Sequence, residues 1–135
     1  MVYVDASALV KLVVAEAESG ALASWVSGRD LVSSAVAGVE VRRAVGVARS
    51  TDAAASARSI AGAAEEVLSR VTLLTIEERV LQRASELRPS PLRTIDSVHL
   101  ATALTLHDPE GIVTYDRRLA DAARGAGLVV FSPGA

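Results

Sequence analysis

The sequence predicts an α/β fold in which a central parallel sheet of about five strands is flanked by helices. Short strand-like runs alternate along the chain with longer segments of helical periodicity, the pattern of strands joined by helical crossovers. Half of the 135 residues are hydrophobic, enough to bury one core. Because neither a linker nor an internal repeat divides the chain, residues 1–135 are expected to form a single domain.

Each predicted strand is a short run rich in β-branched and other aliphatic residues. In chain order the runs are VYV (2–4), LVSS (31–34), VTLLTI (71–76), IVTY (112–115) and LVVF (128–131). Helical segments separate consecutive runs, so the strands are expected to lie parallel to one another.

Helical periodicity and end signals predict seven helices between these strands. In chain order the helices span 7–14, 18–27, 36–49, 52–69, 77–88, 95–107 and 117–124. Gly28 closes the second helix, and Asp52 is the predicted N-cap of the fourth. Pro89-Ser90-Pro91 stops the fifth and forces an extended loop, after which Thr94 is predicted to cap the sixth.

Composition excludes several classes of protein. The chain has no Cys, which excludes disulfides and zinc–thiolate sites. One Trp, one Phe and two Tyr leave no stacking platform for single-stranded nucleic acid, and a net charge of −2 gives no generally basic surface. Asp5 and Lys11 interrupt the apolar N-terminus, and no run approaches the ~18 apolar residues of a membrane span. We therefore expect a cytoplasmic protein with no membrane partner.

Two acidic residues directly follow predicted strands: Asp5 follows VYV, and Asp116 follows IVTY. Ligands of open parallel sheets bind beyond the carboxyl ends of the strands, where the dipole of the next helix also favours an anion. Each aspartate can equally be read as an N-cap. Two of them at the same edge of one sheet favour a functional site.

Glu40 and Asp96 lie where packing disfavours a charge. Glu40 is in the middle of the apolar stripe of helix 36–49, and Asp96 begins the apolar stripe of helix 95–107. A carboxylate that faces a core is costly unless it is paired, protonated or bound to a metal. The alternatives are an ion pair of Glu40 with Arg43 and a capping role for Asp96.

Taken together, the four acids predict a divalent-cation site. Two unit charges about 4 Å apart repel by about 4 kcal/mol at an effective dielectric of about 20. No lysine is near enough in sequence to neutralise such a cluster. Oxygen-only ligands select Mg²⁺ or Mn²⁺ over zinc or copper. A magnesium site of this kind suits phosphodiester hydrolysis, because the metal activates water and offsets charge on the leaving oxygen.

The segments around these acids resemble the four motifs of PIN-domain proteins, and the similarity is nearest to VapC-type toxins. The segments are VYVDASALVKL, VEVRRA, RTIDSVHLATAL and VTYDRRLADAA, followed by the tail GLVVFSPG. Each motif alone is weak, but the four occur in order along the whole chain. The resemblance implies a metal-dependent endoribonuclease that acts as the toxin of a toxin–antitoxin pair and inhibits translation and growth.

The resemblance also assigns roles to particular residues. It implies Asp5, Glu40, Asp96 and Asp116 as catalytic metal-site residues, with Glu40 either a ligand or the group that orients water. Ser7 and Thr114 would support the site through hydrogen bonds; a helix cap and an ordinary strand residue are the alternatives. Arginines available to RNA or antitoxin are Arg93, Arg43 and Arg117, which can also be read as solvated side chains.

The partners implied by the resemblance are an RNA substrate (transfer or ribosomal RNA), a small VapB-type antitoxin and a second copy of the chain in a homodimer. Three other residues are expected to be structural or exposed: His99 as a packed, hydrogen-bonded histidine, Trp25 as a core or interface anchor, and Asp121 as an exposed acid. His99 and His107 are too far apart for the i, i+4 pair of a helical zinc site.

Three other functions compete with the nuclease. An aspartate-dependent phosphatase needs a second Asp two residues after the first, where this chain has Ser7. A receiver-type phosphoacceptor needs a Lys late in the chain, and Lys11 is the only one. A non-catalytic interaction module that keeps the acidic pocket remains open.

Overall fold

A five-stranded, all-parallel sheet forms the centre of the described part of the chain, which comprises residues 1–50, 54–88 and 92–135 of this computed structural model. The strands are β1 (Val2–Val4), β2 (Leu31–Ser34), β3 (Val71–Leu74), β4 (Ile112–Val113) and β5 (Val130–Phe131). They are ordered β3-β2-β1-β4-β5, with the buried strand β1 in the middle. The predicted fold class is confirmed.

Seven helices connect these strands in the part of the chain that the structure describes. They are α1 (Ala6–Lys11), α2 (Ser19–Val26), α3 (Ala35–Arg49), α4 (Ala54–Ser69), α5 (Glu78–Glu86), α6 (Thr94–Ala103) and α7 (Arg117–Gly125). The predicted cap Asp52 and the predicted loop Pro89-Ser90-Pro91 lie outside the described residues. Thr94 is not a cap: Arg93 occupies the N-cap position of α6, and Thr94 is its first residue.

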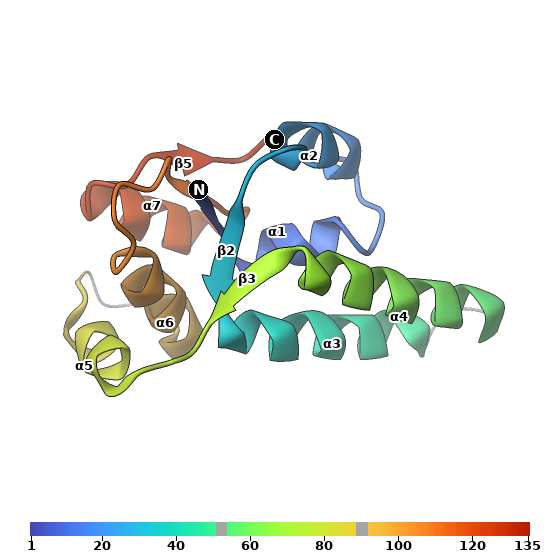
Figure 1. Cartoon of the computed structure of the whole chain (residues 1–135), viewed down its shortest axis with the longest axis horizontal. Coiled ribbons are helices and arrows are strands. Elements are labelled where there is room, and N and C mark those ends of the chain that lie inside the picture. The colour runs from blue at the N-terminus through green and yellow to red at the C-terminus, as the bar shows by residue number, and fades with distance from the viewer. Residues whose placement is uncertain (51–53, 89–91) are drawn as a thin grey trace.

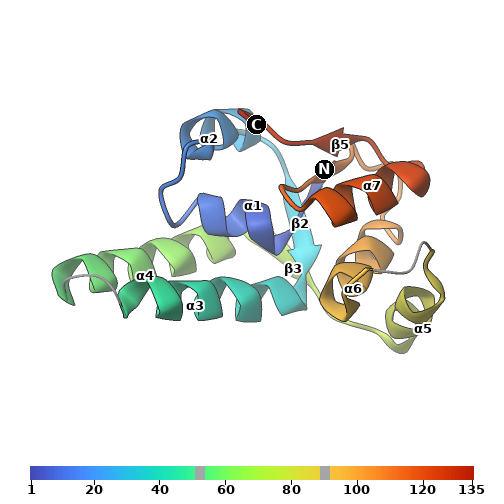
Figure 2. The same cartoon turned by 180° about the vertical axis from the view of Figure 1, so that it is seen from behind.

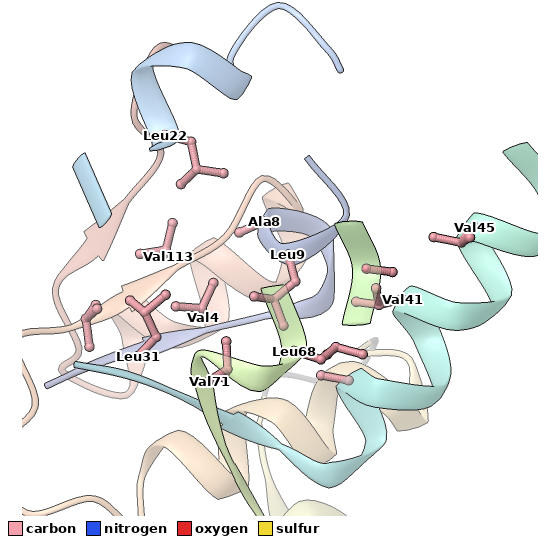
Figure 3. Packing of buried hydrophobic residues seen from close by; sticks show 13 residues of the cluster. Val4, Ala8, Leu9, Leu22, Leu31, Val41, Val45, Leu68, Val71 and Val113 are labelled. Atoms are coloured by element: carbon pink, nitrogen blue, oxygen red, sulfur yellow. The ribbon is translucent and has the colours of Figure 1, made fainter. Parts of the chain in front are cut away.

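Buried side chains alternate between the two faces of the sheet, as the period of two in a strand requires. Val2 and Val4 of β1 join one core cluster, whereas Tyr3 between them joins the other. The first cluster includes residues of α1, α2, α3 and α4, and Figure 3 shows ten of its members labelled around Leu9 of α1. The second cluster includes residues of α6 and α7. Helices therefore cover both faces of the sheet.

The connections between the strands place two strands on each side of β1. From β1 the chain crosses to β2 and β3 on one side, then returns to place β4 and β5 on the other. Helices α3 and α4 run side by side as a hairpin that extends away from the sheet, while α5, α6 and α7 gather at the opposite end (Figure 1, Figure 2). In the described part of the chain, no helix is both long and apolar enough to cross a membrane.

Candidate active site

All four acids singled out from the sequence line one cavity of about 380 Å³. Asp5 directly follows β1, and Asp116 lies three residues after the end of β4, which stops at Val113 and not at residue 115 as predicted; the two strands are neighbours in the sheet. Glu40 comes from α3, and Asp96 comes from the first turn of α6. The strand order reverses between β1 and β4, and open α/β sheets bind ligands in the crevice at such a switch point.

Asp5 is the most buried of the four carboxylates, with 3% of its surface exposed. It is the N-cap of α1, and its Oδ1 accepts hydrogen bonds from the Ala8 amide (3.0 Å) and the Ser7 hydroxyl (2.7 Å). Oδ2 accepts one from the Thr114 hydroxyl (2.6 Å). Burial raises the pKa of Asp5, and these hydrogen bonds oppose that rise. A carboxylate has about four acceptor positions, so Oδ2 retains one for another ligand.

Ser7 and Thr114 join the ends of β1 and β4. Besides donating to Asp5, the Ser7 hydroxyl accepts from the Tyr115 amide at 3.0 Å, and the Thr114 hydroxyl accepts from the Asp116 amide at 3.1 Å. Asp116 itself caps α7 by accepting from the Leu119 amide at 2.9 Å. The two capping aspartates are thus held in a fixed relation. The part that Ser7 and Thr114 play in metal binding stays a prediction.

Arg93 bridges two of the acids. Its Nε donates to Oδ2 of Asp96 at 2.8 Å, and its Nη2 donates to Oδ2 of Asp116 at 3.1 Å. The hydrogen bond to Asp96, reinforced by the charges of both acids, raises the pKa of Arg93. An arginine that precedes α6 therefore neutralises part of the negative charge of this cluster. Its predicted contact with RNA or antitoxin stays a prediction.

Glu40 does not pair with Arg43, the ion pair considered from the sequence; its partner is His99 of α6. The imidazole Nε2 lies 2.6 Å from Oε2 of Glu40, and Nδ1 lies 2.7 Å from the Tyr3 hydroxyl. His99 is 2% exposed, so the prediction of a packed, hydrogen-bonded histidine is confirmed. Its contact with Glu40 is not evident from the sequence. The available signal is that His99 lies one helical turn after Asp96, which places both on the same face.

The cavity contains the only lysine of the sequence. Lys11 lines it, but its ammonium group is bound by Glu16 and by Glu18, the latter at 2.9 Å. The hydrogen bond to Glu16 and, to a smaller extent, that to Glu18 raise the pKa of Lys11. Lys11 therefore stays charged at the rim, held by acids other than the four central ones.

The donor set fits a hard cation, since four carboxylates supply only oxygen ligands. In the described residues, no three acidic or histidine side chains are already gathered as a ligand set. Arg93 instead holds one oxygen of Asp96 and one of Asp116, and His99 holds one oxygen of Glu40. A cation at this site therefore has to compete with Arg93.

The remaining residues considered from the sequence lie outside the cavity. Asp121 is exposed, as expected, and pairs with Arg124 at 3.2 Å. Trp25 packs on Phe131 with ring centroids 4.7 Å apart, which makes it a core contact. Arg43 and Arg117 are exposed, and among the described residues no carboxylate pairs with either.

Known proteins share both the fold and the sequence of this chain. The PIN domain family matches residues 2–125. Ribonuclease VapC46 of Mycobacterium tuberculosis is 43% identical over 134 residues, which cover 98% of this chain and 97% of that protein. Ribonuclease VapC35 of the same species is 38% identical, covering 99% and 98%. The crystal structure of Mycobacterium tuberculosis VapC20, a sarcin–ricin loop cleaving toxin, superposes with a TM-score of 0.70 at 16% identity, covering 98% of this chain and 100% of that one.

The protein is an α/β protein with an acidic cavity at the switch point of its parallel sheet. The chain belongs to the PIN-domain family. Within that family its full-length relatives are VapC ribonucleases. The resemblance and the enzyme class predicted from the sequence are thereby confirmed at the level of the family.

Proposed function

We propose that this protein is a magnesium- or manganese-dependent endoribonuclease that acts as the toxin of a toxin–antitoxin pair and inhibits translation. The observation that carries the proposal is the convergence of Asp5, Glu40, Asp96 and Asp116 on one cavity at the switch point of the sheet. The full-length similarity to proteins named ribonucleases supports RNA as the substrate. The family match over residues 2–125 supports a single PIN domain over 1–135.

The four carboxylates have separate roles in this proposal. Asp5, Asp96 and Asp116 hold the cation directly or through water, and Glu40 either binds it or orients the attacking water. When bound, the cation lowers the pKa of water and offsets negative charge on the phosphodiester. Asp5 is prepared for its part, because Ser7, Ala8 and Thr114 fix its orientation and leave one acceptor position of Oδ2 free.

Exposed arginines beside the cavity supply the contacts for the RNA backbone. Arg43 lies one turn after Glu40 on α3, and Arg117 directly follows Asp116. Because no carboxylate among the described residues pairs with them, their guanidinium groups are available for phosphate. Arg93 would join them if a bound cation took over the neutralisation of Asp96 and Asp116.

Three further proposals concern partners and location. The substrate is a structured RNA of the transfer or ribosomal class. A VapB-type antitoxin silences the enzyme by covering the acidic cavity. Because Asp96 and Asp116 already hold the guanidinium group of Arg93, a basic segment of the antitoxin is the group that fits there. The chain forms a homodimer in the cytoplasm. Light scattering of the purified toxin should then give twice the 14.0 kDa of the chain; a single-chain mass contradicts the dimer.

Cleavage of cellular RNA tests the activity. The purified chain, freed of antitoxin, is incubated with total RNA in Mg²⁺, in Mn²⁺ or in excess chelator, and new RNA ends are mapped. Discrete cleavage is expected with either metal and none with chelator. Asp96→Asn should abolish it, whereas Asp121→Asn, which changes an exposed acid outside the cavity, should leave it intact. If the metal-loaded wild type leaves RNA uncut, the result would favour a non-catalytic interaction module over the nuclease.

Growth separates the toxin claim from the nuclease claim. Expression of the wild type alone is expected to arrest growth, and expression of Asp96→Asn is not. Equal colony counts for the two proteins contradict the toxin claim even if the enzyme cleaves RNA in vitro.

A further inference from the structure

A buried line of hydrogen bonds reaches Glu40 from behind the cavity. The Ser34 amide donates to the Tyr3 hydroxyl at 3.1 Å, that hydroxyl lies 2.7 Å from Nδ1 of His99, and Nε2 of His99 lies 2.6 Å from Oε2 of Glu40. Tyr3 has no exposed surface, and His99 is 2% exposed. The line therefore crosses from β2 and β1 through α6 to α3, and only its last member, Glu40, is partly exposed.

The Tyr3 hydroxyl determines which nitrogen of His99 carries the proton. A tyrosine hydroxyl has an ordinary pKa of about 10 and so keeps its proton at neutral pH. Since the hydroxyl already accepts from the Ser34 amide, its own proton is available to Nδ1 of His99. An imidazole that accepts at Nδ1 carries its proton on Nε2. That proton then faces Oε2 of Glu40.

We propose that His99 is a positioning residue for Glu40: its Nε2–H holds Oε2 and leaves Oε1 as the oxygen that serves the cation or the attacking water. The inference rests on the proposed nuclease function for the meaning of Glu40, but the hydrogen bond itself does not depend on it. It also narrows the role of Glu40, because a carboxylate with one oxygen engaged by an imidazole contributes a single oxygen to the cavity.

The physical need for such a partner follows from the position of Glu40. Its side chain is 26% exposed and hangs from the first half of α3, with several rotatable bonds to restrain. A hydrogen bond from a buried imidazole to a charged acceptor is stronger than one between neutral groups, and water has little access to compete with it. Tyr3 in turn fixes the ring, as outer partners of metal-site histidines do.

Nuclear magnetic resonance of the metal-free protein tests the hydrogen bond without any reaction. The chain has two histidines, and His107 is exposed, so long-range proton–nitrogen correlations give two imidazole patterns with His107 as reference. A proton on Nε2 of His99 is expected. Glu40→Gln should shift the Nε2 resonance, and Asp121→Asn should not. An Nε2 without a proton, or one indifferent to Glu40→Gln, overturns the proposal.

Two substitutions of His99 test positioning in the reaction. The amide nitrogen of glutamine reaches the place of Nε2, whereas that of asparagine does not. His99→Asn is expected to lower kcat for RNA cleavage by about 10–100-fold with KM little changed, the usual cost of losing an outer partner. His99→Gln should stay nearer to the wild type. Melting temperatures of both variants separate misfolding from mispositioning. Wild-type kcat in a folded His99→Asn protein overturns the role of His99.

The two sets of results distinguish this inference from the proposed function. Failure of the wild type to cleave RNA overturns the nuclease assignment, while the proton on Nε2 still decides whether His99 holds Glu40. Conversely, an active nuclease with an unprotonated Nε2 retains the assignment and removes His99 from it.

Discussion

At the residue scale, Arg93 has a part that its sequence position alone does not reveal. It is three residues from Asp96, a spacing that favours a local pair, but the same guanidinium also reaches Asp116 after β4. The side chain is 62% exposed, so the pair costs little to open. Arg93 therefore offsets the repulsion between the two acids and can give way to a more highly charged cation.

Removal of Arg93 should strengthen metal binding. Arg93→Ala takes away the group that competes for Asp96 and Asp116, so the affinity for Mg²⁺ is expected to rise by about two- to fivefold, the equivalent of one exposed ion pair. Calorimetric titration measures the change. Arg124→Ala, which removes an arginine paired with an acid outside the cavity, is the control and should leave the affinity unchanged. Weaker binding by Arg93→Ala would show that Arg93 supports the site instead.

Asp5 exchanges stability for function. Burial raises the pKa of Asp5, so its charged form is disfavoured in the folded protein. This unfavourable contribution to folding is absent while the carboxyl is protonated and develops as the pH rises through the folded pKa. At pH 7 in chelator, Asp5→Asn should therefore melt at a higher temperature than the wild type. Its Mg²⁺ affinity should fall by more than the about 10–100-fold cost of losing an outer partner. Scanning calorimetry measures the melting temperature, and calorimetric titration measures the affinity for Mg²⁺. A melting temperature of Asp5→Asn below that of the wild type contradicts the prediction.

Residue types at the site could be predicted from sequence, whereas their pairings could not. Strand ends and apolar stripes are local patterns, which is why Asp5, Glu40, Asp96 and Asp116 stand out. The partners of Glu40 and of Asp116 come from α6 and from the residue before it, distant in sequence from both. Such contacts depend on how the layers pack, which no local period encodes.

At the element scale, the kinds of helix and strand follow from periodicity, but their ends follow from pairing. The third strand was predicted over 71–76 and ends at Leu74, because its neighbour β2 ends opposite it at Ser34 and turns into α3. The sixth helix was predicted to reach His107 and ends at Ala103, since the next turns tighten into i→i+3 hydrogen bonds such as that from the Thr105 amide to the Thr102 carbonyl. Apolar spacing alone does not distinguish these states.

The ion pair between Arg42 of α3 and Glu65 of α4 should make the stability of the hairpin depend on pH. The two hydrogen bonds, at 2.8 and 3.0 Å, lower the pKa of Glu65. A carboxyl whose folded pKa is lowered stabilises the fold above its unfolded pKa of about 4.3 and loses that effect as the pH falls through the folded value.

Glu65→Gln should accordingly lower the melting temperature slightly at pH 7 and by less at pH 3. Both side chains of the pair are more than half exposed, so the change is small and should shrink further in high salt. Thermal melts of both proteins at the two pH values measure it. An equal deficit at pH 3 would attribute the effect to packing rather than to charge.

At the scale of the whole molecule, the sequence predicts a parallel sheet covered by helices but not the order of its strands. Alternation of strands and helices is visible along the chain, whereas the placement of β4 beside β1 depends on which apolar edges meet. That placement brings the ends of β1 and β4 together and thus makes one cavity from four separate acids. The single-domain extent over 1–135 stays a prediction.

The cavity also joins the two layers of helices. Glu40 belongs to α3, which packs on one face of the sheet, and Asp96 belongs to α6, which packs on the other. A divalent ion or a basic peptide that engages both acids adds a second link between layers that the contact of His99 with Glu40 already joins. Saturation at about 100 times Kd adds about 2.7 kcal/mol to the free energy of unfolding. Backbone amides of α3 and α6 should then exchange with deuterium more slowly together, and inhibitors of this protein could be ranked by that joint protection before any RNA is cut.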